Sequence, residues 1–101
     1  MVRRSFKISI IVNNRLIRHV VIDPHYELKH SDTISDALIV ELVGLLDDGD
    51  FTPEAVIKEF EYYTTENLVL NGKLYRLVWL LEKEQLYIGV MNADRRKEWR
   101  S

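Results

Sequence analysis

The sequence contains no cysteine, only two prolines and four glycines, and no long stretch without charge. The absence of cysteine excludes disulfide bonds, thiolate nucleophiles and cysteine-ligated zinc. The longest run without a charged residue, Gln85 to Ala93, has nine residues, whereas a membrane helix needs about 20 apolar residues. Residues 1–4 lack the apolar run of a signal peptide. These absences favour a soluble cytoplasmic protein without a membrane partner.

The composition is that of an ordinary globular domain. Of the 101 residues, 47% are hydrophobic and 30% are charged, and no repeat or Pro/Gly-rich linker divides them, which indicates a single domain over residues 1–101. The net charge of −2 conceals an uneven distribution: residues 1–22 carry +5, residues 23–66 carry −10, and residues 67–101 carry +3. Such asymmetry bears on the partners of a protein rather than on its fold.

A β-hairpin is expected at the N-terminus. Residues 5–12 alternate apolar and polar side chains, and residues 15–22 are rich in β-branched residues. Between them lies Asn13-Asn14, and asparagine tolerates the positive φ angles of a two-residue hairpin turn. Asp23-Pro24 ends the second strand, because proline lacks the N–H group that a sheet requires.

Two helices are expected next. Residues 33–47 place apolar side chains over half of a helical wheel, after the capping candidates Ser31 and Asp32. Thr52-Pro53 is typical of a helix start. Alternation resumes at residue 59, so this second helix is expected only over residues 53–58.

The C-terminal part is expected to form three antiparallel strands. Residues 59–65 alternate, with a possible extension through residues 68–70, and residues 73–82 and 86–93 are rich in apolar residues. Asn71-Gly72 is a strong signal for a hairpin turn. Residues 73–82 are apolar on both sides apart from Arg76, which is typical of a central strand that is covered on both faces.

The order β-β-α-(α)-β-β-β predicts an α+β fold. It comprises an antiparallel sheet of about five strands with one main helix and a short second helix on one face. The sheet and tails, residues 1–22 and 67–101, would carry +8, and the helix-rich half would carry −10. The sheet face away from the helices is therefore a candidate site for an anion.

The sequence lacks the signatures of several enzyme classes. His25 and His30 are five residues apart, which does not place two ligands on one helix face, and the acidic run at residues 47–50 lacks the spacing of an EF-hand. The four glycines are isolated, so no phosphate-binding loop is present. No metal and no cofactor are expected. His25 and His30 could act as acid and base near neutral pH, or lie on an exposed loop.

Arg76 is the most informative single residue. A lone charge in an apolar strand must reach solvent, pair with an acid or bind an anion. Glu59 or Glu61 on the neighbouring strand is a candidate partner. Both interpretations, a structural ion pair and an anion-binding role, remain open from the sequence.

Basic residues follow the last expected strand. Arg95, Arg96 and Lys97 can contact phosphates at a strand end, and Tyr87 or Trp99 can stack on a base. The alternative is a basic tail without a partner.

Two of these segments resemble the RelE/ParE-like toxin superfamily, in particular its BrnT-type and similar small branches. Residues 72–79, Gly-Lys-Leu-Tyr-Arg-Leu-Val-Trp, are similar to a strand of that superfamily with the pattern Gly-x-x-Tyr-Arg-hydrophobic. Residues 90–98 are similar to its closing strand, which runs into Arg-Arg and an acid. His30-Ser31-x-x-Ile34 is similar to its pre-helix segment, so the resemblance covers roughly residues 25–98.

The resemblance implies a toxin of a toxin–antitoxin system. Many such proteins are metal-independent mRNA endoribonucleases, in which an RNA 2′-OH attacks the neighbouring phosphate. Arg76 and Arg95 match the arginines that bind phosphate in the superfamily, and Lys29 and His30 would supply charge and acid/base catalysis. The implied partners are an antitoxin and RNA or the ribosome.

A second hypothesis is a protein-interaction module without enzymatic activity, which could be a homodimer. It rests on the apolar strands, the basic ends and the acidic middle, which could dock onto a partner or a second copy.

Overall fold

The computed structural model describes residues 4–22 and 34–96 and contains one six-stranded sheet and one helix over those ranges. In chain order the elements are β1 (Arg4–Val12), β2 (Arg15–Ile22), α2 (Asp36–Gly44), β3 (Ala55–Ile57), β4 (Phe60–Leu70), β5 (Lys73–Glu82) and β6 (Tyr87–Arg96). The strand order is β1-β2-β6-β5-β4-β3. Strands β2 and β6 pair in parallel, and all other neighbours are antiparallel.

The predicted α+β fold with five antiparallel strands and two helices is wrong. The sheet is mixed and has six strands, and the expected helix over residues 53–58 is replaced by β3. So short a helix is unstable alone, and Val56 and Ile57 favour a strand. The β3–β4 hairpin turns at Lys58, whose φ is 55°. The parallel pairing joins strands far apart in the sequence, which local patterns cannot reveal.

Both hairpin turns predicted from asparagine are confirmed. Asn13 and Asn14 have φ angles of 53° and 66°, and Asn71 and Gly72 have 54° and 76°. Positive φ at both central residues is the requirement of a type I′ turn. Strand β5 has the predicted bounds, whereas β6 continues to Arg96, so that Arg95 and Arg96 belong to the strand instead of following it.

Helix α2 is shorter than the predicted residues 33–47. It begins after Ser35, whose hydroxyl accepts a hydrogen bond from the Leu38 N–H at 3.1 Å; the expected caps Ser31 and Asp32 lie outside the described residues. After Gly44 the chain continues in tighter turns. The carboxylate of Asp47 accepts from the Ile11 N–H, and the N–H of Asp48 donates to the Ile11 carbonyl. This turn covers the end of edge strand β1.

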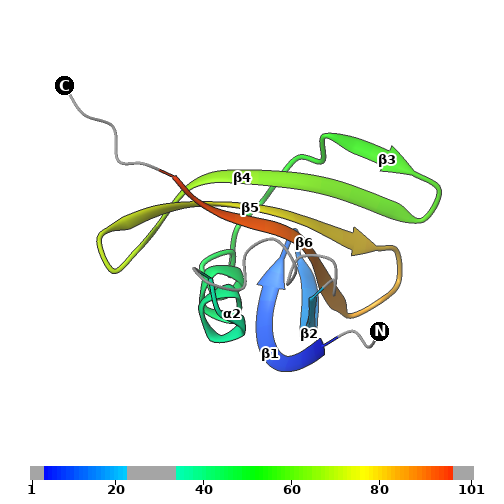
Figure 1. The fold of residues 1–101 in the computed structure, drawn as a ribbon. Helices are drawn as coiled ribbons and strands as arrows, with labels where there is room; N and C mark the ends of the chain where they lie inside the picture. The colour runs from blue at the N-terminus through cyan, green and yellow to red at the C-terminus, as the bar shows by residue number, and fades with distance from the viewer. Residues whose placement is uncertain (1–3, 23–33, 97–101) are drawn as a thin grey trace.

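The core lies between two layers. Helix α2 and the β1–β2 hairpin lie on one side of the meander, the three successive strands β4, β5 and β6 (Figure 1). Apolar side chains of both layers form one buried cluster. Its largest members are Trp79, Tyr63, Ile17, Ile22, Ile39, Leu42, Leu46, Leu77, Leu81 and Ile88.

The register assigns each side chain of β5 to one of two faces. Tyr75, Leu77, Trp79 and Leu81 are buried in the core, and we call this the core face. The alternate residues Leu74, Arg76, Val78 and Leu80 are only half-buried on the opposite side, which we call the open face. Because the open face of β5 is only half-buried, the prediction of a strand covered on both faces is wrong for the described residues.

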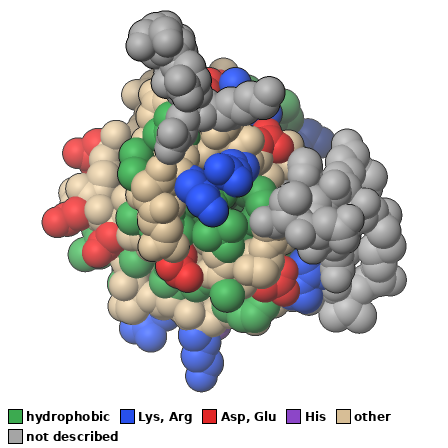
Figure 2. Space-filling view, turned by 60° about the vertical axis from the view of Figure 1, so that its left-hand side comes forward, with side chains coloured by type: hydrophobic (Ala, Val, Ile, Leu, Met, Phe, Trp, Pro, Cys, Tyr) green, Lys and Arg blue, Asp and Glu red, His purple; other side chains and the backbone are tan. Residues whose placement is uncertain are grey.

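The predicted layering of charge, a basic sheet over acidic helices, is also wrong. Glu59, Glu61 and Glu66 belong to the acidic middle of the sequence but lie on β4 or on the turn before it. Basic residues of the first hairpin are paired with that acidic middle, since Arg4 contacts Asp36 at 2.6 Å and Arg15 contacts Glu61 at 2.9 Å. Acidic, basic and hydrophobic side chains are interspersed on the surface seen in Figure 2.

Candidate functional site

The structure places four of the predicted site residues. Arg76 lies on β5, and Tyr87, Arg95 and Arg96 lie on β6. The predicted catalytic residues Lys29 and His30, the alternative acid/base residue His25, and the predicted RNA-binding residue Lys97 lie outside the described residues. A complete catalytic constellation is therefore not assembled from the described part of the chain.

Arg76 is engaged in an ion pair on the open face. Its Nε donates to Asp94 Oδ2 at 3.1 Å, and Nη2 donates to the same oxygen. The predicted partners Glu59 and Glu61 are wrong, because the register places Arg76 directly opposite Asp94 on β6. The hydrogen bond to Asp94, partly opposed by desolvation, raises the pKa of Arg76 above its ordinary value.

The surroundings of Arg76 are acidic. In addition to Asp94, the carboxylates of Glu66 and Glu54 act on its guanidinium through space. Glu54 is held at the outer side of β4, where it accepts a hydrogen bond from the Thr64 hydroxyl at 3.1 Å. An anion that approaches Arg76 would meet this negative charge.

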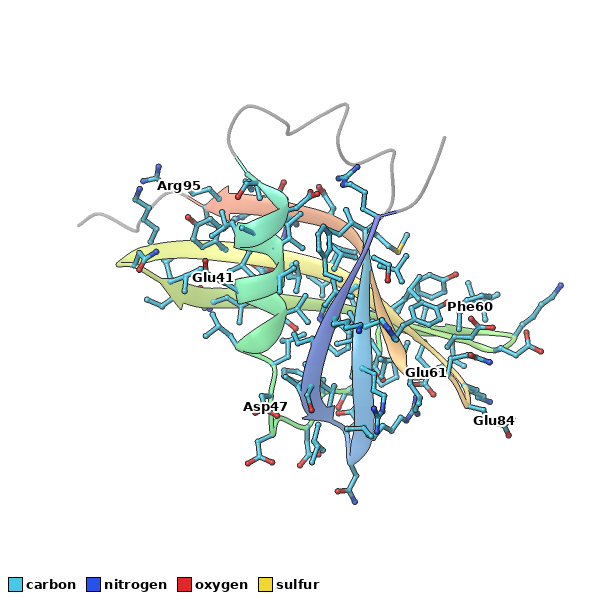
Figure 3. All side chains as sticks on the ribbon, turned by 90° about the horizontal axis from the view of Figure 1, so that it is seen from below. Glu41, Asp47, Phe60, Glu61, Glu84 and Arg95 are labelled. Atoms are coloured by element: carbon cyan, nitrogen blue, oxygen red, sulfur yellow. The ribbon has the colours of Figure 1, made fainter. Side chains whose placement is uncertain are left out.

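Arg76 and Arg95 point to opposite faces of the sheet. Arg76 pairs with Asp94 and Arg95 with Tyr75, and successive residues of a strand alternate between its faces. Arg95 therefore belongs to the core face, at the end of the meander opposite to Glu61 (Figure 3). Arg96 shares the open face with Arg76, and Tyr87 lies at the other end of β6. The structure does not bring the four residues into one site.

Arg15 and Glu61 form a partly buried polar network, in which Glu61 pairs with Arg15 and not with Arg76; no local signal in the sequence pointed to Arg15. Arg15 Nη2 donates to both oxygens of Glu61 at 3.0 and 2.9 Å, and the Tyr63 hydroxyl donates to Glu61 Oε1 at 2.8 Å. Asn13 Nδ2 donates to the Tyr63 hydroxyl at 3.0 Å, and Asn13 Oδ1 accepts from the Phe51 N–H. The network ties the first hairpin to β4.

The network shifts two pKa values in opposite directions. The hydrogen bond from Arg15 lowers the pKa of Glu61, despite the burial that acts against it. Burial, followed by the hydrogen bond to Glu61, raises the pKa of Tyr63 to about 12. Glu61 is therefore a carboxylate and Tyr63 a neutral phenol at neutral pH.

Aromatic packing against Tyr63 holds this network in place. The rings of Tyr63 and Trp79 are stacked at 4.1 Å, and Phe51 meets Trp79 edge-on at 5.3 Å. The indole Nε1 donates to the Thr65 hydroxyl at 2.9 Å. Among the described residues, Glu61 is the one buried charged residue, and its carboxylate is occupied by Arg15 and Tyr63. The arrangement serves to hold the two layers together.

The open face of the described structure carries an apolar surface. Its side chains come from β3, β4, β5 and β6 and are half-buried or exposed; they are Ile57, Phe60, Tyr62, Val69, Leu74, Val78, Leu80 and Met91. Ile57 is 56% exposed, Val69 58% and Met91 40%. No described segment packs over them (Figure 1).

The charged groups of the open face are mostly acidic. They are Glu54, Glu66, Glu82 and Asp94 against Arg76, Arg96 and Lys7, which the register places on β1 beside His19 and Tyr87. Asp94 and Arg76 neutralise each other, which leaves three carboxylates around the apolar surface, one guanidinium at its end and Lys7 on β1. A half-open pocket, lined partly by Phe60, Leu80 and Glu82, lies on this face.

Over residues 4–22 and 34–96, no group of three or more histidine and carboxylate side chains is placed to hold a metal ion. In the same part of the chain, α2 is too short to cross a membrane. Comparisons with protein-family models, with curated proteins and with solved structures found no match to this chain.

Proposed function

We propose that this chain is a protein-interaction domain whose open face docks an apolar, positively charged segment of a partner protein in the cytoplasm. The observation that carries the proposal is the row of eight partly exposed apolar side chains across four neighbouring strands. The solvated face of an antiparallel sheet is usually polar. A contiguous apolar patch rimmed by polar groups marks an interaction surface.

The charge of the rim favours a basic partner over a second copy. Two copies that met face to face would each present the same rim, with more carboxylates than cations, so the unpaired carboxylates of one copy would meet a rim of like net charge. Like charges across an interface oppose binding by several kcal/mol. A segment with lysine or arginine beside its apolar residues would instead meet opposite charge.

Peptide display tests this proposal directly. Random 12-residue peptides are selected on the wild-type protein, and the enriched peptides are then measured by fluorescence anisotropy. We expect apolar residues interspersed with lysine or arginine. The variants Met91→Arg and Met91→Glu place opposite charges at the same position, so Met91→Arg is expected to weaken binding about tenfold more than Met91→Glu.

The control variant Leu16→Arg places the same charge on an exposed leucine of β2 that is not one of the eight apolar residues and does not line the pocket, and it is expected to leave binding unchanged. Sedimentation equilibrium of the wild type at low and high salt measures self-association. If the wild type forms a tight homodimer and Met91→Arg dissociates it, the open face binds a second copy of this chain and not a basic partner. A monomer that enriches no peptide would contradict the proposal altogether.

A second candidate function is an RNA-targeting, toxin-like domain, because the register gathers basic residues at one end of the meander. Lys73 opens β5, and Arg95 and Arg96 close β6 opposite Tyr75 and Leu74. All three basic residues are exposed. Exposed arginine and lysine side chains are the groups with which proteins neutralise nucleic-acid phosphates. The resemblance to the RelE/ParE-like toxins then implies metal-independent mRNA cleavage and an antitoxin partner.

Binding of a single-stranded 20-nucleotide RNA at several salt concentrations tests this second candidate. A plot of log K against log salt concentration has a negative slope. If Arg95 and Arg96 each contact a phosphate, the double variant Arg95→Ala/Arg96→Ala is expected to reduce the magnitude of this slope by about 1.4. The control variant Lys83→Ala changes a basic residue of the β5–β6 turn and is expected to keep the slope. Equal, weak binding by all three proteins, with no cleavage of ribosome-bound mRNA and no growth inhibition, would eliminate this function.

A further inference from the structure

A pocket on the open face has a more specific chemistry than the apolar surface around it. Its volume is about 170 Å³, which is near that of an engineered protein cavity of about 150 Å³ that admits benzene. It lies where β2, β6, β5 and β4 meet. Its lining consists of Val21, Phe60, Leu80, Glu82, Tyr87, Gly89, Val90 and Met91.

The pocket owes part of its depth to Gly89, which has no side chain to fill it. Gly89 lies directly opposite Leu80 on the neighbouring strand. A Cβ atom at this position would be 2.9 Å from Leu80 Cδ1 and 3.6 Å from Tyr87 Cε2. Any larger residue at position 89 would therefore push Leu80 outward and reduce the depth of the pocket.

The wall of the pocket includes one carboxylate, that of Glu82, beside the Tyr87 hydroxyl. Glu82 Oε1 accepts a hydrogen bond from the Tyr87 hydroxyl at 2.6 Å. A carboxylate has about four acceptor sites, so Glu82 can accept further donors. Within the described part of the chain, Glu82 forms no ion pair. Its negative charge is available to a ligand.

We infer that this pocket receives one lysine or arginine side chain of the docked partner, an inference that rests on the proposed function. The aliphatic stem would pack on Val21, Leu80 and Met91, as long basic side chains do on apolar surface. The cationic end would lie near the rings of Phe60 and Tyr87 and pair with Glu82. A neutral apolar side chain in the pocket would leave the Glu82 carboxylate desolvated without a partner.

Charge-neutral replacement of the ligand tests this inference. In each peptide enriched by display, arginine is replaced in turn by citrulline and lysine by norleucine, and affinities are measured for the wild type, Glu82→Gln and Tyr87→Phe. We expect that replacement at one basic position of the peptide lowers its affinity for the wild-type protein about tenfold. The same replacement is expected to cost Glu82→Gln less than about twofold, because the charge that recognises the cation is already absent.

The two protein variants separate charge from structure. Both lose or alter the hydrogen bond between Glu82 and Tyr87, but only Glu82→Gln loses the negative charge. Tyr87→Phe is therefore expected to keep the tenfold dependence on the basic residue. Equal loss of that dependence in both variants would overturn the inference and assign Glu82 a purely structural role.

Two failures remain distinguishable. If peptides bind the open face but every basic position matters equally in wild type and Glu82→Gln, the pocket inference is wrong and the docking function stands. If no peptide is enriched, N-acetyl-arginine methylamide is titrated and amide chemical shifts are followed. Shifts around Gly89 that disappear in Glu82→Gln would support a cation pocket without a docking face, and their absence would overturn both.

Discussion

Both faces of strand β5 carry apolar side chains, but the surroundings of the two faces differ. Leu81 on the core face is 1% exposed, whereas its neighbour Leu80 on the open face is only half-buried. Helix α2 and the first hairpin cover the core face. Apolar residues on both sides of a strand indicate that both of its faces are covered by other groups. The described part of the chain covers only one face of β5.

The two faces also treat charge differently. On the core face the carboxylate of Glu61 is buried, and it is held by Arg15 and Tyr63. On the open face the Arg76–Asp94 pair is 31% and 21% exposed. The two guanidinium groups are similarly exposed, 35% for Arg15 and 31% for Arg76, so the contrast lies in the carboxylates. Water can replace the partner of the more exposed Asp94 carboxylate more readily than that of the buried Glu61 carboxylate.

Alanine substitution of the two adjacent leucines is the largest expected effect. Leu81→Ala leaves a cavity in the core and is expected to lower the free energy of unfolding by about 2–5 kcal/mol. Leu80→Ala removes atoms that are partly hydrated already, so its cost is expected to be about 1 kcal/mol. Urea denaturation of both variants measures the difference.

Protein concentration provides the control for this comparison. A similar loss for both variants, dependent on concentration, would mean that a second copy covers the open face in solution. A similar loss independent of concentration would mean that another part of the same chain covers it. Either result would contradict the distinction between the faces.

The second comparison concerns the two ion pairs. Glu61→Gln leaves the Arg15 guanidinium without its counter-charge and is expected to cost about 2 kcal/mol, less than a fully buried pair because the Arg15 side chain is 35% exposed. Asp94→Asn, in the pair whose carboxylate is more accessible to water, is expected to lower the free energy of unfolding by about 0.5–1 kcal/mol. Urea denaturation at neutral pH measures the loss of free energy of unfolding for both variants. A larger loss for Asp94→Asn would mean that the Arg76–Asp94 pair contributes more to stability than the Arg15–Glu61 pair.

The sequence predicted what local signals determine. The Asn13-Asn14 and Asn71-Gly72 turns and the bounds of β5 follow from residues that are adjacent in the chain. The parallel pairing of β2 with β6 and the contact between Arg15 and Glu61, 46 residues apart, depend on tertiary packing. Local patterns therefore led to the wrong fold class and the wrong partner for Arg76.

Bulges in the strands were equally hidden from the sequence. Thr65 pairs with Leu77 but Leu68 pairs with Tyr75, so β4 contains one extra residue at Glu66-Asn67. A second bulge at Met91 in β6 separates the pairs formed by Val78 and Trp79. Such bulges are part of the architecture of the open face, because Met91 borders its pocket.

The pH dependence of stability sharpens the comparison further. Because the pKa of Glu61 is lowered from 4.5 in the folded state, its contribution is present above pH 4.5 and is lost as the pH falls below that value. The pKa of Tyr63 is raised from 10 to about 12. Its contribution is present below pH 10 and is lost as the pH rises toward 12.

Two variants assign these losses to the core-face network. Glu61→Gln is expected to remove the part of the acid loss that belongs to Glu61, and Tyr63→Phe the alkaline loss between pH 10 and 12. Free energies of unfolding measured across pH provide the test. An unchanged alkaline loss in Tyr63→Phe would show that other tyrosines or lysines cause it.

The smallest expected effect on stability separates folding from binding on β3. Ile57 is 56% exposed on the open face, and its neighbour Val56 is 55% exposed on the opposite side. Ile57→Thr and Val56→Thr are each expected to change the free energy of unfolding by less than about 0.5 kcal/mol, because neither side chain is buried. Only Ile57→Thr should weaken the binding of display-selected peptides, since only Ile57 belongs to the open face. Equal weakening by both variants would move the docking surface from the face of the sheet to the edge of β3, where a partner strand would contact side chains on both sides.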